Sequence, residues 1–233
     1  MIAKELLGLL YSGNGERSKF GRTSVSGSNK IILEKKIEFP VERRKNFDNQ
    51  LRDLGLKEDR LKDASLLDVG CGGGDLVFGL HNTRITNEAY GADFEPVIEE
   101  TKKQLPPEYR GNFFAVNSVG EGTELPKGVK DQRFDIVTFH GVFDPYAEKK
   151  NRAFLETNIK HAHNIMKDDG EARIHPANQK PWEEFLSKYN SKFPQERVLF
   201  EFKRSRPAEG PLDVNNKYLL LRKANVHKGR YQC

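Results

Sequence analysis

The strongest indication of the fold is LDVGCGGG at residues 67–74, followed directly by DLVFGL at residues 75–80. Its first residues are apolar enough for a buried strand, and the residues after the glycines are typical of a helix. Glycine has no Cβ, so the turn between them can tighten and its backbone can touch a ligand. The N-terminus of the following helix directs free N–H groups toward such a ligand. The stretch therefore predicts a strand, a ligand-binding turn and a helix.

From Ser65 onward, the sequence alternates between segments typical of strands and segments typical of helices. We expect further strands at residues 89–93, 112–116, 134–139 and 171–175, with helices near 96–105 and 148–167. This alternation is typical of parallel strands joined by right-handed helical crossovers, with helices on both faces. After a short helix at 182–189, the β-rich runs at 197–204 and 217–223 predict an antiparallel pair that closes the sheet edge.

The N-terminal part of the chain has a different character. Residues 11–30 are rich in glycine, serine and basic side chains and show little periodicity, which indicates a loop or an arm. Phe47, Leu51, Leu54 and Leu61 recur at near-helical spacing, so we expect an amphipathic helix there, interrupted or ended by Gly55. We therefore divide the chain into an arm and helix at 1–60, which caps the site, and a ligand-binding domain at 61–233.

Composition limits the class of protein. The 233 residues suffice for one core with an extension, and 39 Lys+Arg against 34 Asp+Glu give a formal charge of +5. A mean hydropathy of −0.73 indicates a polar surface. The only cysteines are Cys71 and Cys233, which disfavours disulfides or a cysteine metal cluster. We find neither a signal peptide nor an apolar stretch of roughly 20 residues, and therefore expect a cytoplasmic protein without membrane contact.

Two acidic residues narrow the choice of ligand for the glycine turn. Asp68 stands on the strand before the glycines, where it would repel a pyrophosphate and favours a cationic ligand instead. Asp93 ends the second strand, where a carboxylate can accept hydrogen bonds from both hydroxyls of a ribose. The alternative role for Asp93 is the N-cap of the helix that follows. Together the two residues favour an adenosine-containing cation over a dinucleotide.

The residues LDVGCGGG at 67–74 and GADFEP at 91–96 resemble motif I and the acidic post-I motif of class I S-adenosylmethionine-dependent methyltransferases. The resemblance extends over residues 66–175 and implies a Rossmann-like, doubly wound α/β sheet, mostly parallel. It implies that Asp68 supports the loop and the ammonium group, that Asp93 holds the ribose, and that Phe94 lies against the adenine. It further implies that the turn that binds the methionine moiety is made by Gly70, Cys71, Gly72 and Gly74. After the third strand, it implies an adenine contact made by Asn117 and Ser118.

The run FDIVTFHG at 134–141 resembles motif IV of that family, the segment that faces the methyl group and the acceptor. The polar candidates for catalysis are His140, Asp144 and Tyr146. Methyl transfer is an in-line displacement that depends on alignment, and a base is needed only when the nucleophile carries a proton of high pKa. His140 is the preferred base or orienting residue and also borders the cofactor, the alternative being a histidine that merely caps the strand end. His175, at the end of the fifth strand, is the second candidate.

Two further histidines, Cys71 and Trp182 are expected to have structural rather than catalytic roles. His161 and His163 lie on a helix with a separate apolar stripe, so we expect them at the surface. We expect Cys71 to be a small filler in the turn, and Trp182 to anchor the last helix on the sheet. No metal site is expected.

The acceptor remains open at this level. The leading hypothesis is methyl transfer to an oxygen or nitrogen atom of a small molecule. An RNA methyltransferase is the alternative, favoured by the pI near 9.0, by the basic arm residues Arg17, Lys19, Arg22 and Lys30, and by Arg43-Arg44-Lys45. The layout of GGGDLVF at 72–78, with Asn151-Arg152 and Gly170-Glu171 downstream, is also faintly similar to enzymes that methylate uridine N3 in ribosomal RNA. That family's Asn-Phe-Pro-His is replaced here by HGVF at 140–143. The glycine turn would also suit a cofactor-binding regulatory protein or an NAD-dependent oxidoreductase.

Overall fold

The glycine-rich stretch folds as the sequence predicts. In the computed structural model, strand β1 (Leu66–Val69) leads through the glycines into helix α4 (Asp75–Asn82). The structure describes residues 39–116, 129, 132–143, 152–205 and 217–224. These lie in one compact unit, Glu38–Cys233.

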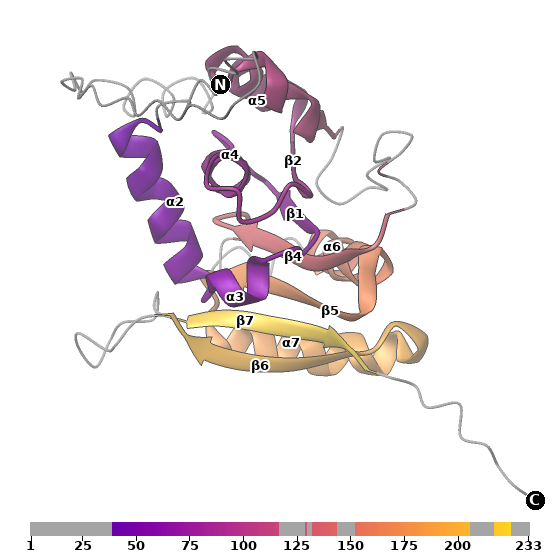
Figure 1. The fold of residues 1–233 in the computed structure, drawn as a ribbon. Helices are drawn as coiled ribbons and strands as arrows, with labels where there is room; N and C mark the ends of the chain where they lie inside the picture. Colours follow the sequence, from indigo (N-terminus) through magenta and orange to yellow (C-terminus); the bar gives the residue numbers. More distant parts are fainter. Residues whose placement is uncertain (1–38, 117–128, 130–131, 144–151, 206–216, 225–233) are drawn as a thin grey trace, which may run out of the picture. The chain divides into compact units, whose positions relative to one another are not determined.

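A seven-stranded sheet with the order β3-β2-β1-β4-β5-β7-β6 organises this unit (Figure 1). Its first five strands in the chain pair in parallel, whereas β7 runs antiparallel to both β5 and β6. The strands other than β1 are β2 (Ala89–Asp93), β3 (Phe113–Ala115), β4 (Phe134–His140), β5 (Met166–His175), β6 (Val198–Arg204) and β7 (Lys217–Lys223). The mostly parallel α/β sheet with an antiparallel C-terminal pair is therefore confirmed.

Helices connect and flank these strands. They are α2 (Val41–Asp53), α3 (Glu58–Leu61), α5 (Glu95–Gln104), α6 (Arg152–Ile165) and α7 (Gln179–Lys192), with short 3-10 turns η1 (Pro107–Asn112) and η2 (Pro194–Glu196). The helix expected up to residue 167 ends at Ile165, because the chain already pairs with β4 at Met166. The register then shifts before Glu171, so polar residues that look like a loop belong to an irregular start of β5.

The core lies where the sheet meets α6 and α7. Trp182 is fully buried and makes edge-to-face contacts with Phe143 and Phe185, which confirms its role as the anchor of α7. Cys71 is also buried, as expected for a filler. His161 and His163 are half-buried rather than at the surface.

Helix α2 belongs to the same packed unit as the sheet. The Phe47 ring lies directly against Gly79 of α4, and Gly55, with a φ of +62°, turns the chain from α2 toward α3. Figure 1 shows α2 running beside α4. Residues 1–38 lie outside the described residues, so the capping role of the arm stays a prediction. Among the described helices, none combines the length and the apolar composition needed to cross a bilayer.

Candidate active site

The glycine turn is held in shape by the neighbouring strand. The backbone N–H groups of Gly70 and Cys71 donate to the carbonyl of Ala92 at 2.7 and 3.2 Å. Gly74 has a φ of +74° and is the N-cap of α4, and a Cβ there would collide with the Phe113 ring. Only glycine combines this backbone conformation with this close approach.

Space lies open above the middle of the turn. A Cβ built on Gly72 or Gly73 would meet no atom within 4 Å. The hydroxyl of Thr101 donates to the carbonyl of Gly72 at 2.7 Å, which holds the turn against α5. The turn is thus a firm cradle whose open side can accept a ligand at the N-terminus of α4.

Asp93 joins the turn to the end of β2. Its Oδ2 accepts the N–H of Gly72 at 2.8 Å and its Oδ1 accepts the N–H of Phe94 at 2.7 Å. The N-cap of α5 is Phe94, so the alternative role of Asp93 as that N-cap is wrong. Each carboxylate oxygen has a second lone pair, which leaves acceptor capacity for ribose hydroxyls. Beside it Phe94 is 45% exposed, so part of its side chain is accessible to a ligand.

Asp68 is a buried carboxylate in the middle of the sheet. It is only 1% exposed, and its Oδ1 accepts a hydrogen bond from the Thr138 hydroxyl at 2.7 Å. Burial raises the pKa of Asp68 to about 6, and the Thr138 hydrogen bond and the charge of His140 offset part of that effect. A nearby cation stabilises the ionised form of a carboxylate that burial has destabilised in this way.

Helix α2 closes one side of the turn. The Arg43 guanidinium donates to the carbonyl of Gly73 at 3.1 Å and forms an ion pair with Asp75 at 3.0 Å. One helical turn later, the Asn46 amide donates to Asp75 at 2.9 Å. These contacts tie α2 to the N-terminus of α4, where the glycine turn ends.

A second polar group lies at the carboxyl ends of β4 and β5. His140 and His175 are register partners, and their rings stack at 5.3 Å between centroids with 12° between planes. Nε2 of His140 lies 3.4 Å from Oδ2 of Asp53, the last residue of α2. The His140 side chain is 25% exposed, whereas Asp53 and His175 are buried. The three side chains form a partly exposed polar group on β4, β5 and α2, and β4 lies beside the strand that leads into the glycine turn.

The remaining predicted site residues lie outside the described residues. They are Asn117 and Ser118 after β3, and Asp144 and Tyr146 after β4. Their roles stay predictions.

A family model for the methyltransferase domain matches residues 61–203, which is more than half of the chain. This chain belongs to the methyltransferase domain family. The comparison with curated proteins found no match.

Solved structures of methyltransferases share the fold of this methyltransferase at low sequence identity. An S-adenosylmethionine-dependent methyltransferase from Clostridium acetobutylicum is 11% identical, with a TM-score of 0.52, over 83% of this chain and 95% of that one. The CcbJ methyltransferase from Streptomyces caelestis is 12% identical, with a TM-score of 0.51, over 74% and 89%. The methyltransferase domain of bacterial CtHen1-C is 17% identical, with a TM-score of 0.51, over 75% and 98%. At these identities the likeness concerns the fold alone.

S-adenosylmethionine is the cofactor of this methyltransferase, and the described residues fit it. Open space over Gly72 and Gly73 suits its aminocarboxylate end, and buried Asp68 suits its positive charge. The half-exposed Phe94 ring offers an apolar face for the adenine, beside Asp93 at the end of β2. The family match also decides against the NAD-dependent alternative.

Three residues that contact the predicted site residues could not be recognised from the sequence or were only weakly marked in it. Asp53 is one charged residue among many on α2, and its histidine partner lies 87 positions away. Arg43 is likewise indistinguishable from its basic neighbours. Thr138 is the exception, because it is the one hydroxyl inside an otherwise apolar run of β4 and pairs in register with Asp68. A register alignment of the two strands would have indicated it.

Proposed function

We propose that this methyltransferase transfers a methyl group to an oxygen or nitrogen atom of a small molecule bound at the carboxyl ends of β4 and β5. The observation that carries the proposal is the position of His140. Its ring is partly exposed at the end of the strand next to β1, within 3.4 Å of a buried carboxylate and stacked on a second imidazole. Ligands of open α/β sheets bind at this edge of the sheet.

The protein aligns the two reactants and accepts the proton that the acceptor loses. S-adenosylmethionine supplies an electrophilic methyl group, which the acceptor lone pair attacks while the carbon–sulfur bond breaks and S-adenosylhomocysteine leaves. Asp68 and Asp93 hold the cofactor on either side of the turn. His140 orients the proton-bearing atom of the acceptor and receives its proton, with Asp53 stabilising the resulting positive charge. His175 packs flat against the His140 ring and limits its rotation.

Of the described basic residues that favoured RNA, Arg43 is engaged within the protein, whereas Lys45 is exposed. Arg43 is half-buried and binds Gly73, Asp75 and Gln104. Arg44 forms an ion pair with Asp48, although that pair is exposed and weak. The small-molecule acceptor rests on the polar group at the ends of β4 and β5 rather than on these charges, and RNA becomes an outcome of the test.

The test separates cofactor binding from methyl transfer. Titration calorimetry with S-adenosylmethionine, S-adenosylhomocysteine and NAD is expected to show binding of the first two alone. Transfer of radiolabelled methyl is then screened against pooled small molecules and against total RNA. Label in RNA alone would contradict the small-molecule proposal, and cofactor binding without transfer to any acceptor would support the regulatory alternative.

His140→Ala supplies the matched variant for this screen. We expect unchanged cofactor affinity and a turnover lower by a factor of about 10² or more, the usual contribution of a positioned acid or base. His163→Ala, on α6 and away from the site, is the control and should retain the rate. An undiminished rate in His140→Ala would reduce His140 to a structural role.

A further inference from the structure

Asp53, His140 and His175 form a cluster of metal-ligating side chains. One ligand atom from each lies within 4.8 Å of the other two. The three residues come from α2, β4 and β5, which are separate in sequence and meet only in the folded protein. Two imidazoles and one carboxylate are a donor set that proteins use for catalytic transition metals with open coordination positions.

The backbone around this cluster is firmly held. His140 and His175 face each other as register partners, and the N–H of Gly141 donates to the carbonyl of His175 at 2.8 Å. On the other side, the guanidinium of buried Arg173 donates to the carbonyls of Leu54 and Gly55 at 2.9 and 2.5 Å. Those carbonyls directly follow Asp53, so the end of α2 is tied to β5. Ligands on rigid elements are better prepared to bind an ion than ligands on loops.

We propose that Asp53, His140 and His175 bind one divalent transition-metal ion of the Zn²⁺ type at the acceptor end of the active site. Bonds of about 2.0–2.2 Å in a tetrahedral site place ligand atoms about 3.3 Å apart. The three ligand atoms lie within 4.8 Å of one another, so side-chain rotations that move them by up to about 1.5 Å complete the set. Asp53 and His175 are buried and His140 is partly exposed. The ion therefore has protein on one side and an open position toward the acceptor.

The charges nearby favour a cation in this place. His140 lies close enough to Asp68 for its charge to lower the pKa of that carboxyl, and Asp93 influences Asp68 from the other side. The carboxylates of Asp53, Asp68 and Asp93 are all buried along this edge of the sheet. They offset the positive charges of an ion and of a sulfonium cofactor. Mg²⁺ is a poor candidate because it prefers oxygen ligands and retains its waters.

The role of the ion in the reaction rests on the proposed function, whereas its binding does not. An acceptor hydroxyl on the open position loses its proton to solvent more readily, because a bound metal lowers the pKa of an oxygen ligand. The acceptor class that fits is therefore a small molecule with an ionisable hydroxyl. With the ion bound, His140 is its ligand and the acceptor proton leaves to solvent, whereas in the metal-free protein His140 receives that proton as in the proposed function.

The experiment is a Zn²⁺ titration of the untagged, full-length protein against a chromogenic chelator, repeated with Co²⁺ and read by its visible absorption. We expect one ion per chain for both metals and no binding of Mg²⁺. His140→Gln and His175→Gln should each lower Zn²⁺ affinity at least about tenfold. His163→Gln is the matched control with an unchanged affinity. Circular dichroism and S-adenosylmethionine titration establish that each variant is folded.

The outcomes separate this inference from the proposed function. No Zn²⁺ binding at about 0.1 mM by a protein that binds S-adenosylmethionine would overturn the metal site and leave the methyltransferase assignment intact. Equal Zn²⁺ affinity in the wild type and in both glutamine variants would place the ion elsewhere and overturn it too. Site-specific Zn²⁺ binding without methyl transfer to any acceptor would support the metal site while refuting the proposed acceptor chemistry.

Discussion

The burial of the single residue Asp68 lowers the stability of the folded protein while it prepares the site for a cation. Burial raises the pKa of its carboxyl from 3.8 to about 6. Between those two values the folded protein holds a proton that the unfolded chain has lost, so this residue favours folding more as the pH falls through 6. At pH 7 the carboxylate is ionised and costs stability. That cost is offset when a positively charged cofactor binds beside it.

The affinity for S-adenosylmethionine should therefore depend on pH through Asp68. Below about pH 6 the free protein is protonated there, and the cofactor must displace that proton, so affinity should be about tenfold weaker at pH 5 than at pH 7. Titration calorimetry in buffers of different ionisation enthalpy would detect the released proton. In Asp68→Asn the affinity should be weaker throughout and lack this step. A flat profile in the wild type would mean that no cationic group approaches Asp68.

Asp93 offers a second test at this scale. Asp93→Ala should weaken S-adenosylmethionine binding by about 1–3 kcal/mol, because hydrogen bonds to a charged acceptor are lost. The neighbouring exposed Glu95→Ala is the control and should bind normally. If the folded Asp93→Ala protein retained full affinity in calorimetry, Asp93 would serve only the turn, through its bonds to Gly72 and Phe94.

At the scale of the element, α2 connects the two halves of the site. Its first turn holds the glycine turn through Arg43, and its last residue, Asp53, reaches the histidines of β4 and β5. The helix is fixed in this position by Phe47, which is 1% exposed and packs on Gly79 of α4. The apolar spacing of α2 predicted the helix, but its position across the sheet edge depends on this contact.

Gly79→Ala tests that contact. Helix propensity alone would stabilise the protein by up to about 1 kcal/mol. The added Cβ would instead lie within 2.7 Å of atoms of the confined Phe47 ring. Overpacking of this kind costs about 1–3 kcal/mol, so we expect a lower free energy of unfolding in urea. Gly111→Ala, where a Cβ meets no atom within 4 Å, is the control. A stabilised Gly79→Ala protein would show that α2 can shift.

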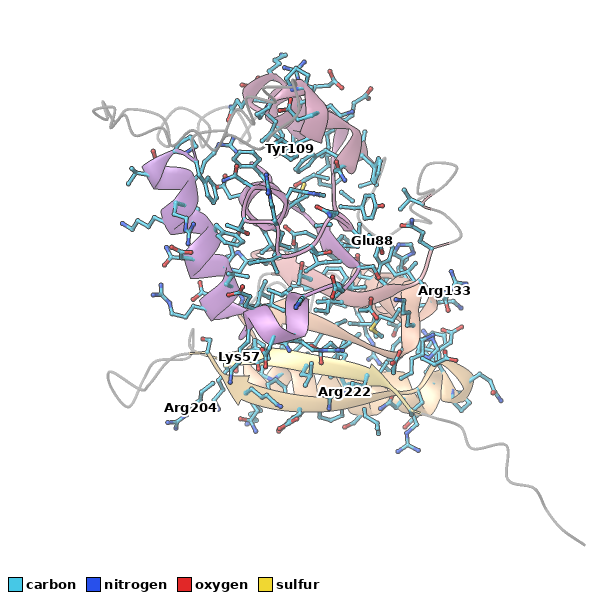
Figure 2. The ribbon with its side chains drawn as sticks, viewed as in Figure 1. Lys57, Glu88, Tyr109, Arg133, Arg204 and Arg222 are labelled. Carbon is cyan, nitrogen blue, oxygen red and sulfur yellow. The ribbon has the colours of Figure 1, made fainter. Side chains whose placement is uncertain are left out.

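At the scale of the whole molecule, a buried ion group joins the sheet to its N-terminal helices. Arg173 of β5 pairs with Glu171 at 2.8 Å and binds the chain between α2 and α3. Arg222 on β7, labelled in Figure 2, lies 3.5 Å from the same glutamate. Arg60 of α3 lies 3.8 Å from it. The packing of β5, β7, α3 and the end of α2 against one another therefore depends on the buried carboxylate of Glu171 and its partner Arg173.

Arg173→Met should lower the free energy of unfolding by about 2–4 kcal/mol, since removing one partner leaves Glu171 buried with weaker neighbours. It should also weaken Zn²⁺ binding, because Asp53 loses its anchor. Arg222→Met removes a half-exposed partner and should cost less than about 1 kcal/mol. Equal losses in urea titrations of the two variants would contradict the central role of Arg173.

The helices and strands could be predicted from the sequence, because strand and helix periods and the glycine turn are local properties of the chain. Residues 66–82 and 89–104 show this, and so does the antiparallel pair at 198–204 and 217–223. The chemical character of the cofactor turn could be predicted for the same reason. Asp68 and Asp93 stand at fixed distances from the glycines along two neighbouring strands.

The surroundings of His140 depend on how the elements pack and could not be predicted from the sequence. Its carboxylate neighbour lies on α2, 87 residues earlier, and His175 reaches it through the pairing of β4 with β5. Nothing local marks Asp53 as different from the other charges of its helix. The burial that raises the pKa of Asp68 is likewise a property of the assembled sheet. Contacts between residues distant in sequence depend on how the elements pack, and no periodicity encodes that packing.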